Sequence, residues 1–269
     1  MLSRLALSLC FVCLVSVGVL TISCGSSNSG TKPCTGGPYN VLGDWQITVT
    51  ATGGGPVTGY GAIDSAGLAL FFDSLGDTLQ LPTLTGTCAF SGSINFYSVP
   101  GPPPNGDVEV TDTITGNVNS ATSITGSFTG TPSGTISAAP FTQLTGSVSA
   151  VSGSKTGAVQ GVFGATSSTP GTAILLATTF TPAGSNNSMS FATTNLAGCE
   201  ATGTFTEVGT SNVFDVSITL TPTCPIIGTF TGIGFESSSD YFGLNSGGAD
   251  TYLYADILDG TNTFVIEFF

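Results

Sequence analysis

The stretch Phe214-Asp-Val-Ser-Ile-Thr-Leu220 alternates apolar and polar side chains without a break. Successive side chains of a β-strand point to opposite faces, so a period of two places the apolar side chains on one face and the polar ones on the other. The same alternation recurs in segments 45–49 and 108–114, and large apolar residues also recur with a period of two in 252–255 and 264–268. These segments predict half-buried strands, and no segment predicts a long helix.

Turn-forming residues separate these segments at short intervals, in clusters such as Gly-Asp, Gly-Ser and Pro-Ser-Gly. Closely spaced short strands are typical of sandwiches and barrels. Segment 100–106, Pro-Gly-Pro-Pro-Pro-Asn-Gly, predicts a stiff loop because proline has no amide hydrogen to give to a ladder. The predicted fold class is therefore all-β, an antiparallel meander that forms an up-and-down (lipocalin-like) barrel or a β-sandwich.

A weak internal repeat is present, since Cys88-Ala-Phe-Ser-Gly-Ser-Ile94 resembles Cys199-Glu-Ala-Thr-Gly-Thr-Phe205. One interpretation is chance similarity in a chain rich in Gly and Thr. The other is a pair of related halves, 39–140 and 141–269, whose meanders close on one another. Such closure would give a barrel without open edges.

The composition is unusually poor in charge. Charged residues make up 7% of the chain, against about a quarter in typical soluble proteins. Only three residues are basic and 16 are acidic, which gives a formal net charge of −13. A chain with so few Lys and Arg cannot neutralise a phosphate backbone, so nucleic acid is excluded as a partner. The scarcity of Lys and Arg also argues against electrostatic attachment to anionic lipid headgroups.

The N-terminus has the pattern of an export leader. Arg4 precedes the apolar run 5–22, as in a secretory signal. A transmembrane helix is disfavoured because no basic stop-transfer cluster follows, and an ordinary cleaved signal peptide is a further alternative. The window Leu20-Thr-Ile-Ser-Cys24-Gly25 is similar to a lipobox, in which the cysteine is acylated, although Thr21 stands where an aliphatic residue is usual.

These features predict three parts of the chain: a signal peptide over 1–23, a lipid-attachment site and flexible tether over 24–38, and an all-β domain over 39–269. The acyl chains on Cys24 would then be the means of membrane attachment. Gly25 is not the Asp that often marks inner-membrane retention in similar lipoproteins. The expected location is therefore the cell envelope, with the outer membrane favoured.

Four cysteines remain in the mature chain if Cys24 carries lipid, namely Cys34, Cys88, Cys199 and Cys224. An even number in an oxidising compartment predicts disulfides, and three connectivities satisfy it. We favour Cys34–Cys88 with Cys199–Cys224. The alternative is free buried thiols, which behave as small hydrophobes.

Catalytic machinery is sparse in this sequence. The chain has no His, which removes the usual general base and neutral metal ligand. Lys155 lacks the SxxK spacing of Ser-Lys enzymes. Asp107, Glu109 and Asp112 lie close together and could supply a glycosidase carboxylate pair, but almost any acidic protein offers such a pair, and an exposed strand face is the favoured interpretation. We therefore predict a protein that is not an enzyme and needs no cofactor.

Two further sets of side chains are weaker candidates. Asp256, Asp259 and Asn262 supply oxygen ligands of the kind that calcium prefers, but no EF-hand spacing is present, so we predict no metal site. Tyrosines on strand-like segments could stack on sugar rings, although strand tyrosines usually serve packing. They are Tyr97, Tyr241, Tyr252 and Tyr254.

Several segments together carry a family resemblance: Gly43-Asp-Trp-Gln46, the run Leu-Thr-Gly-Ser-Val over 144–148, Gly-Cys-Glu-Ala-Thr-Gly over 198–203, and the ending over 252–269. They resemble a group of uncharacterised bacterial envelope lipoproteins with an all-β mature domain. The resemblance implies an envelope location but no activity.

Three functions follow as hypotheses. The leading one is a lipid-anchored envelope protein without enzymatic activity, which binds an apolar small molecule or another envelope component, or acts in surface adhesion. A barrel of this size can enclose a small ligand. The alternatives are a carboxylate-based enzyme acting on polysaccharide and a small outer-membrane β-barrel.

Overall fold

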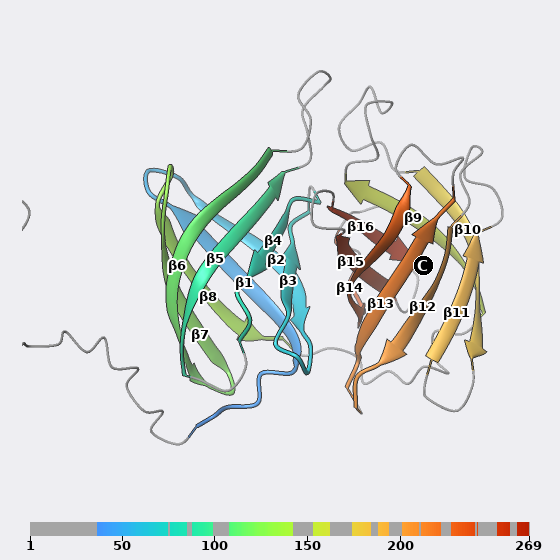
Figure 1. The fold of residues 1–269 in the computed structure, drawn as a ribbon, viewed down its shortest axis with the longest axis horizontal. Helices are drawn as coiled ribbons and strands as arrows, with labels where there is room; N and C mark the ends of the chain where they lie inside the picture. The colour runs from blue at the N-terminus through green and yellow to red at the C-terminus, as the bar shows by residue number, and fades with distance from the viewer. Residues whose placement is uncertain are drawn as a thin grey trace, which may run out of the picture. The chain divides into compact units, whose positions relative to one another are not determined.

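Sixteen antiparallel strands make up the described part of the chain, which we analyse in a computed structural model (Figure 1). The described residues are 37–74, 76–84, 88–98, 108–141, 153–161, 174–183, 188–193, 201–209, 211–221, 227–239, 241, 252–258 and 263–268. No helix within these ranges is long and apolar enough to cross a bilayer.

The first eight strands form a closed barrel in which each strand pairs with the next along the chain. Figure 1 shows this meander in blue to green. Its strands are β1 (Gly43–Ala51), β2 (Pro56–Ile63), β3 (Ala69–Phe72), β4 (Thr78–Leu81), β5 (Ala89–Ser98), β6 (Val108–Ser120), β7 (Ser123–Thr129) and β8 (Gly134–Pro140). The ring closes where β1 pairs with β8, from Trp45↔Pro140 to Ala51↔Gly134.

The last eight strands form a second closed barrel of the same kind. Its strands are β9 (Gly153–Gly161), β10 (Ile174–Ala183), β11 (Ser188–Thr193), β12 (Ala201–Glu207), β13 (Val213–Leu220), β14 (Gly228–Ser237), β15 (Tyr252–Leu258) and β16 (Thr263–Phe268). The ring closes where β16 pairs with β9, from Phe264↔Gly161 to Phe268↔Gly157.

Each barrel buries a core of its own. The apolar positions of the alternating strands point inward, as Trp45 and Ile47 do in β1 and Phe214 and Val216 do in β13. The core of the second barrel is strongly aromatic, with Phe180, Phe205, Phe214, Phe230 and Phe268 all buried. Close packing of such side chains is what stabilises a barrel of this size.

A third set of buried apolar residues joins the two barrels, and we call it the inter-barrel cluster. Its members from the first barrel are Ala62, Leu70 and Phe72, and those from the second half of the chain are Val208, Val213, Ile233, Phe235, Tyr252, Tyr254 and Val265. Phe72 and Phe235 stack with ring centroids 5.8 Å apart. Pro33–Phe269 accordingly forms one compact unit.

The prediction of an all-β antiparallel barrel is confirmed, and every strand segment quoted from the sequence lies within a strand. The structure differs in one respect, because each meander closes on itself and the two do not share one barrel. The two similar segments of the weak internal repeat also fall on strands that are not equivalent. β5 is the fifth strand of its barrel, whereas β12 is the fourth strand of the other. The predicted loop over 100–106 lies outside the described residues.

Candidate functional site

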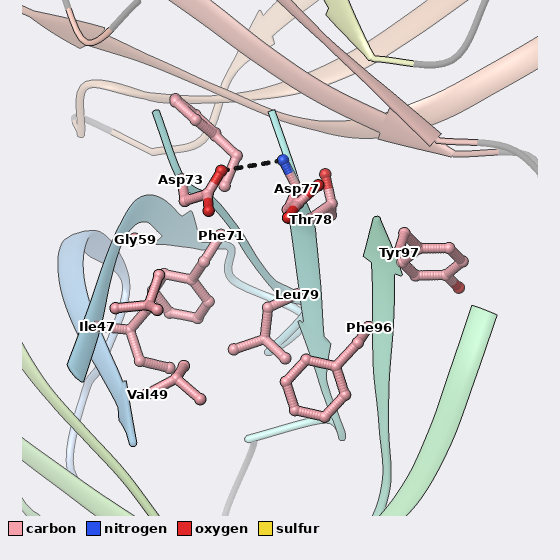
Figure 2. A pocket seen from close by; sticks show the side chains of 12 residues that line it. Ile47, Val49, Gly59, Phe71, Asp73, Asp77, Thr78, Leu79, Phe96 and Tyr97 are labelled. Carbon is pink, nitrogen blue, oxygen red and sulfur yellow. Dashed lines mark hydrogen bonds between the residues drawn. The ribbon is translucent and has the colours of Figure 1, made fainter. Parts of the chain in front are cut away.

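A cavity of about 200 Å³ opens at one end of the first barrel (Figure 2). Side chains from β1 to β5 surround it, and most of them are apolar. The apolar and aromatic lining residues are Ile47, Val49, Val57, Gly59, Phe71, Phe72, Leu79, Phe96 and Tyr97, and the polar ones are Asp73, Asp77 and Thr78. The cavity thus combines an apolar wall with a small polar set.

The cavity exists because large side chains fill the barrel unevenly. Ile47 and Val49 lie in the second half of β1 and line the cavity, whereas Trp45 lies in the first half and belongs to the packed core. Trp45 is fully buried, and its indole Nε1 donates a hydrogen bond to the Val41 carbonyl at 2.7 Å. Phe90 packs in the same core. The first barrel is therefore filled at the Trp45 end and hollow at the other.

A tight turn between β3 and β4 carries the two acidic groups of the cavity. The Asp73 amide donates to the Asp77 carbonyl at 3.0 Å, and the Asp77 amide donates to Asp73 Oδ1 at 3.1 Å. Gly76 has φ of 87°, a left-handed conformation that glycine adopts without steric cost. These bonds fix the turn, and with it the positions of Asp73 and Asp77 beside the cavity.

The electrostatic character of the mouth is negative. Asp73 and Asp77 are half-exposed, and no Lys or Arg is present among the lining residues. Acidic groups at the opening of an apolar cavity concentrate the field there and attract positive charge. The rings of Phe71 and Phe96 also border the cavity (Figure 2), and the faces of such rings carry partial negative charge.

A second group of acidic side chains is buried beside the inter-barrel cluster. Asp44 of β1 accepts a hydrogen bond at Oδ2 from the side-chain amide of Asn212, which belongs to the second half of the chain. Burial raises the pKa of Asp44 to about 8; the Asn212 hydrogen bond lowers it, and the nearby Glu236 charge raises it further. Asp44 is thus protonated in the folded protein at neutral pH.

Asp256 of β15 is completely buried and connects this group to the cavity. Its Oδ1 accepts a hydrogen bond at 3.2 Å from the hydroxyl of Thr78, a lining residue of the cavity. Burial raises the pKa of Asp256 well above its usual value, while the hydroxyls of Thr78 and Thr263 lower it in part. The wall of the cavity therefore contacts the second barrel directly at Thr78.

Phe72 provides a second such contact, because it both lines the cavity and belongs to the inter-barrel cluster. Its ring centroid lies 5.3 Å from that of Tyr254. The Tyr254 hydroxyl in turn lies 2.6 Å from Glu267 Oε1 and 2.8 Å from the Ser239 carbonyl oxygen. The same hydroxyl accepts a hydrogen bond from the Tyr241 amide at 2.8 Å, so Tyr254 is held by several partners of the second half of the chain.

The structure describes one of the cysteines predicted to matter. Cys88, which directly precedes β5, is disulfide-bonded. Cys24, Cys34, Cys199 and Cys224 lie outside the described residues. The lipidation of Cys24 and the pairings Cys34–Cys88 and Cys199–Cys224 therefore stay predictions.

The acidic candidates from the sequence are not brought together as a described site. Asp107 lies outside the described residues, as does the side chain of Glu109, and Asp112 is half-exposed on β6. Asp256 is buried against Thr78, while Asp259 and Asn262 lie outside the described residues. Over the described ranges, no group of three or more His, Cys, Asp or Glu is placed to hold a metal ion.

The tyrosines separate into two places. Tyr97 lines the cavity, whereas Tyr241, Tyr252 and Tyr254 pack in or against the inter-barrel cluster. Tyr241 stacks on Tyr60 of β2 with ring centroids 4.0 Å apart. Packing is therefore the role that the structure gives to the tyrosines of the second half.

Sequence reasoning missed the acidic turn at the cavity, although a signal for it exists. Asp64-Ser-Ala-Gly67 and Asp73-Ser-Leu-Gly76 repeat the same pattern on either side of a short apolar run. Two like turns around four or five apolar residues indicate two successive hairpins. Such hairpins place every second turn at the same end of the barrel.

The described residues thus form two closed all-β barrels, and the cavity described above lies in the first of them. No family model, curated protein sequence or solved structure matches the chain.

Proposed function

We propose that this chain is a lipid-anchored protein of the bacterial cell envelope, without enzymatic activity, whose first barrel binds a small apolar ligand. The observation that carries the proposal is the cavity of about 200 Å³ at the open end of that barrel, with its mainly apolar lining. Cavities lined by apolar and aromatic side chains, with a few polar groups, are the usual sites for small molecules.

The two barrels differ in a way that supports this division of roles. Five buried phenylalanines pack together in the core of the second barrel: Phe180, Phe205, Phe214, Phe230 and Phe268. The first barrel leaves Phe96 only partly buried, in the wall of its cavity. We infer that the first barrel holds the ligand, while the second buttresses it through the inter-barrel cluster.

The outer faces of the strands support a barrel surrounded by water. On β7 (Ser123–Thr129) and β8 (Gly134–Pro140), most of the exposed side chains are Ser or Thr. Among the described residues, the exposed large apolar side chains are Val57 and Ile227. A membrane-embedded barrel instead presents a broad apolar band to the lipid.

The ligand proposal is tested with a neutral probe, n-octanol, by ligand-observed NMR on the purified domain. Val49 is half-buried in the cavity wall, so Val49→Trp should fill the cavity with little damage to the core and abolish binding. Ile227→Trp adds the same side chain at a position that is 61% exposed, outside the cavity, and should leave binding unchanged. Equal binding by both variants would reject the site.

The anchor is tested in the same protein expressed with its leader in a Gram-negative bacterium. Mass spectrometry of the membrane fraction should find an acylated N-terminal peptide beginning at Cys24. Cys24→Ser should move the protein from the membrane to the soluble fraction, because the chain has little basic charge to hold it at lipid. A wild-type protein that is cleaved elsewhere and soluble would refute the anchor and leave the ligand site standing.

A further inference from the structure

We propose that the cavity takes an apolar cation, meaning a small molecule with an alkyl or aromatic body and an ammonium group. This inference rests on the proposed function and specifies the chemistry of its ligand. It would set the ligand apart from the fatty acids that an apolar barrel could otherwise hold.

Two carboxyl groups lie beside the cavity. Asp73 and Asp77 both line it and are fixed by the hydrogen bonds of their shared turn. A ligand whose apolar body occupies the wall of Ile47, Val49 and Leu79 can bring its polar end to this turn (Figure 2). A carboxylate in that place would add a third negative charge, whereas an ammonium would be attracted by two carboxylates.

The wall of the cavity is partly aromatic. Phe71 and Phe96 turn their rings toward the other lining side chains (Figure 2), and Phe72 and Tyr97 also belong to the lining. The faces of such rings attract cations, and sites for quaternary ammonium ligands are built from them. The combination of rings with carboxylates, and with no basic residue in the lining, favours a cation over a neutral ligand.

The volume of the cavity limits the size of its ligand. An apolar cavity of about 150 Å³ admits benzene, and this cavity is about 200 Å³. A single ring or a short alkyl chain therefore fits, and the two acyl chains of a phospholipid do not. The occupant is a free small amphiphile, not a lipid held in a bilayer.

The test compares three probes that share one alkyl chain, namely n-octylamine, n-octanol and n-octanoate. At about pH 7 the amine is protonated and the carboxylic acid ionised, as the Lys and Glu side chains are. Dissociation constants come from ligand-observed NMR at low salt. We expect the amine to bind about tenfold more tightly than the alcohol, as ring contacts and a part-exposed ion pair allow, and the octanoate to bind more weakly than the alcohol.

Asp73→Asn and Asp77→Asn identify the charges responsible. Asn at 73 keeps the oxygen that accepts the Asp77 amide, so the turn should hold while the charge is lost. The amine-to-alcohol affinity ratio should fall in each variant and approach one in the double variant. Asp64→Asn is the matched control, because Asp64 accepts the Leu68 amide in a turn of the same pattern outside the cavity, and its ratio should equal that of the wild type.

The outcomes separate this inference from the proposed function. If n-octanol binds but the amine has no advantage, or if Asp64→Asn lowers the ratio as much as Asp73→Asn does, the cation inference is wrong and the ligand site stands. If none of the probes binds to a domain whose circular dichroism shows folded β-structure, the apolar ligand itself is refuted.

Discussion

Asp44 is a carboxyl group kept in its neutral form by its surroundings. It is 5% exposed, and among the described residues its Oδ1 has no hydrogen-bond partner. An ionised group in such a place loses most of its hydration, which is why burial raises the pKa of Asp44 to about 8. Proton uptake by this side chain is therefore linked to folding.

The sign of the linkage follows from the two pKa values. In the unfolded chain Asp44 has the ordinary value of 3.8, and in the folded protein about 8. Between these values the folded state binds the additional proton, so the free energy of unfolding falls as pH rises through this window. The loss approaches about 1.4 kcal/mol per pH unit within it and ceases above the folded pKa.

We predict that Asp44→Asn removes this component of the pH dependence. Urea unfolding of wild type and variant between about pH 5 and pH 8.5 should show a smaller loss of stability with pH in the variant. Some slope should remain, because burial also raises the pKa of Asp256. Asp112→Asn, at a half-exposed position of β6, should keep the wild-type slope; the same slope in Asp44→Asn would contradict the buried neutral carboxyl.

At this scale the sequence predicts packing residues better than site residues. Trp45 begins the segment 45–49, whose alternation predicts a half-buried strand, and it lies in the first core. The burial of Asp44 and Asp256 was not foreseeable, because both alternate with apolar residues as solvent-facing positions do. Their faces are buried by residues of the other barrel, a contact that no local pattern encodes.

At the scale of the strands, the pairing of β2 with β3 depends on a close approach of their backbones. A Cβ atom added at Gly61 of β2 would lie 1.9 Å from the Leu70 carbonyl oxygen and 2.7 Å from Phe71 Cα. These are backbone atoms of β3, which cannot move aside as a flexible side chain can. The β2–β3 pairing therefore requires glycine at position 61.

We predict that Gly61→Ala destabilises the first barrel by about 2 kcal/mol or more, since overpacking forces backbone shifts. Thermal unfolding followed by circular dichroism should show the lower melting temperature. Gly55→Ala, in the turn just before β2, is the control because an added Cβ there meets nothing within 4 Å. Equal melting temperatures for the two variants would show that β2 and β3 are not packed as described.

Elements differ in how well the sequence predicts them. Long alternating strands such as β13 follow from period two alone. β3 and β4 have four residues each and consecutive buried positions, because one face points into the barrel and the other toward the second barrel. Such runs show no alternation, so their strand character depends on the turns that flank them.

The arrangement of the whole molecule is the level of structure that the sequence predicts least well. Closure of each meander on itself depends on the pairing of β1 with β8 and of β9 with β16, strands far apart in the chain. Nothing local distinguishes this from one shared barrel, since the strands and their alternation are the same in both. The cavity escapes sequence reasoning for the same reason, because its wall is assembled only when the first ring closes.

The inter-barrel cluster should make the two barrels unfold together. Phe235 of β14 is 1% exposed and contacts the rings of Phe72 and Phe141, with centroids 5.8 Å and 6.5 Å away. Unfolding of either barrel would strip these contacts from the other. A shared buried surface of this kind couples the two free energies of unfolding.

We predict that Phe235→Ala uncouples the barrels. Trp45 is the single tryptophan of the chain and lies in the first core, so its fluorescence follows the first barrel alone, while circular dichroism follows both. The two urea transitions should coincide in the wild type and separate in Phe235→Ala, which removes about 3–5 kcal/mol of packing. Phe214→Ala removes a similar side chain from the second core but keeps the inter-barrel contacts, so its two transitions should shift together. Coincident transitions in Phe235→Ala would show that the barrels are coupled by something other than this cluster.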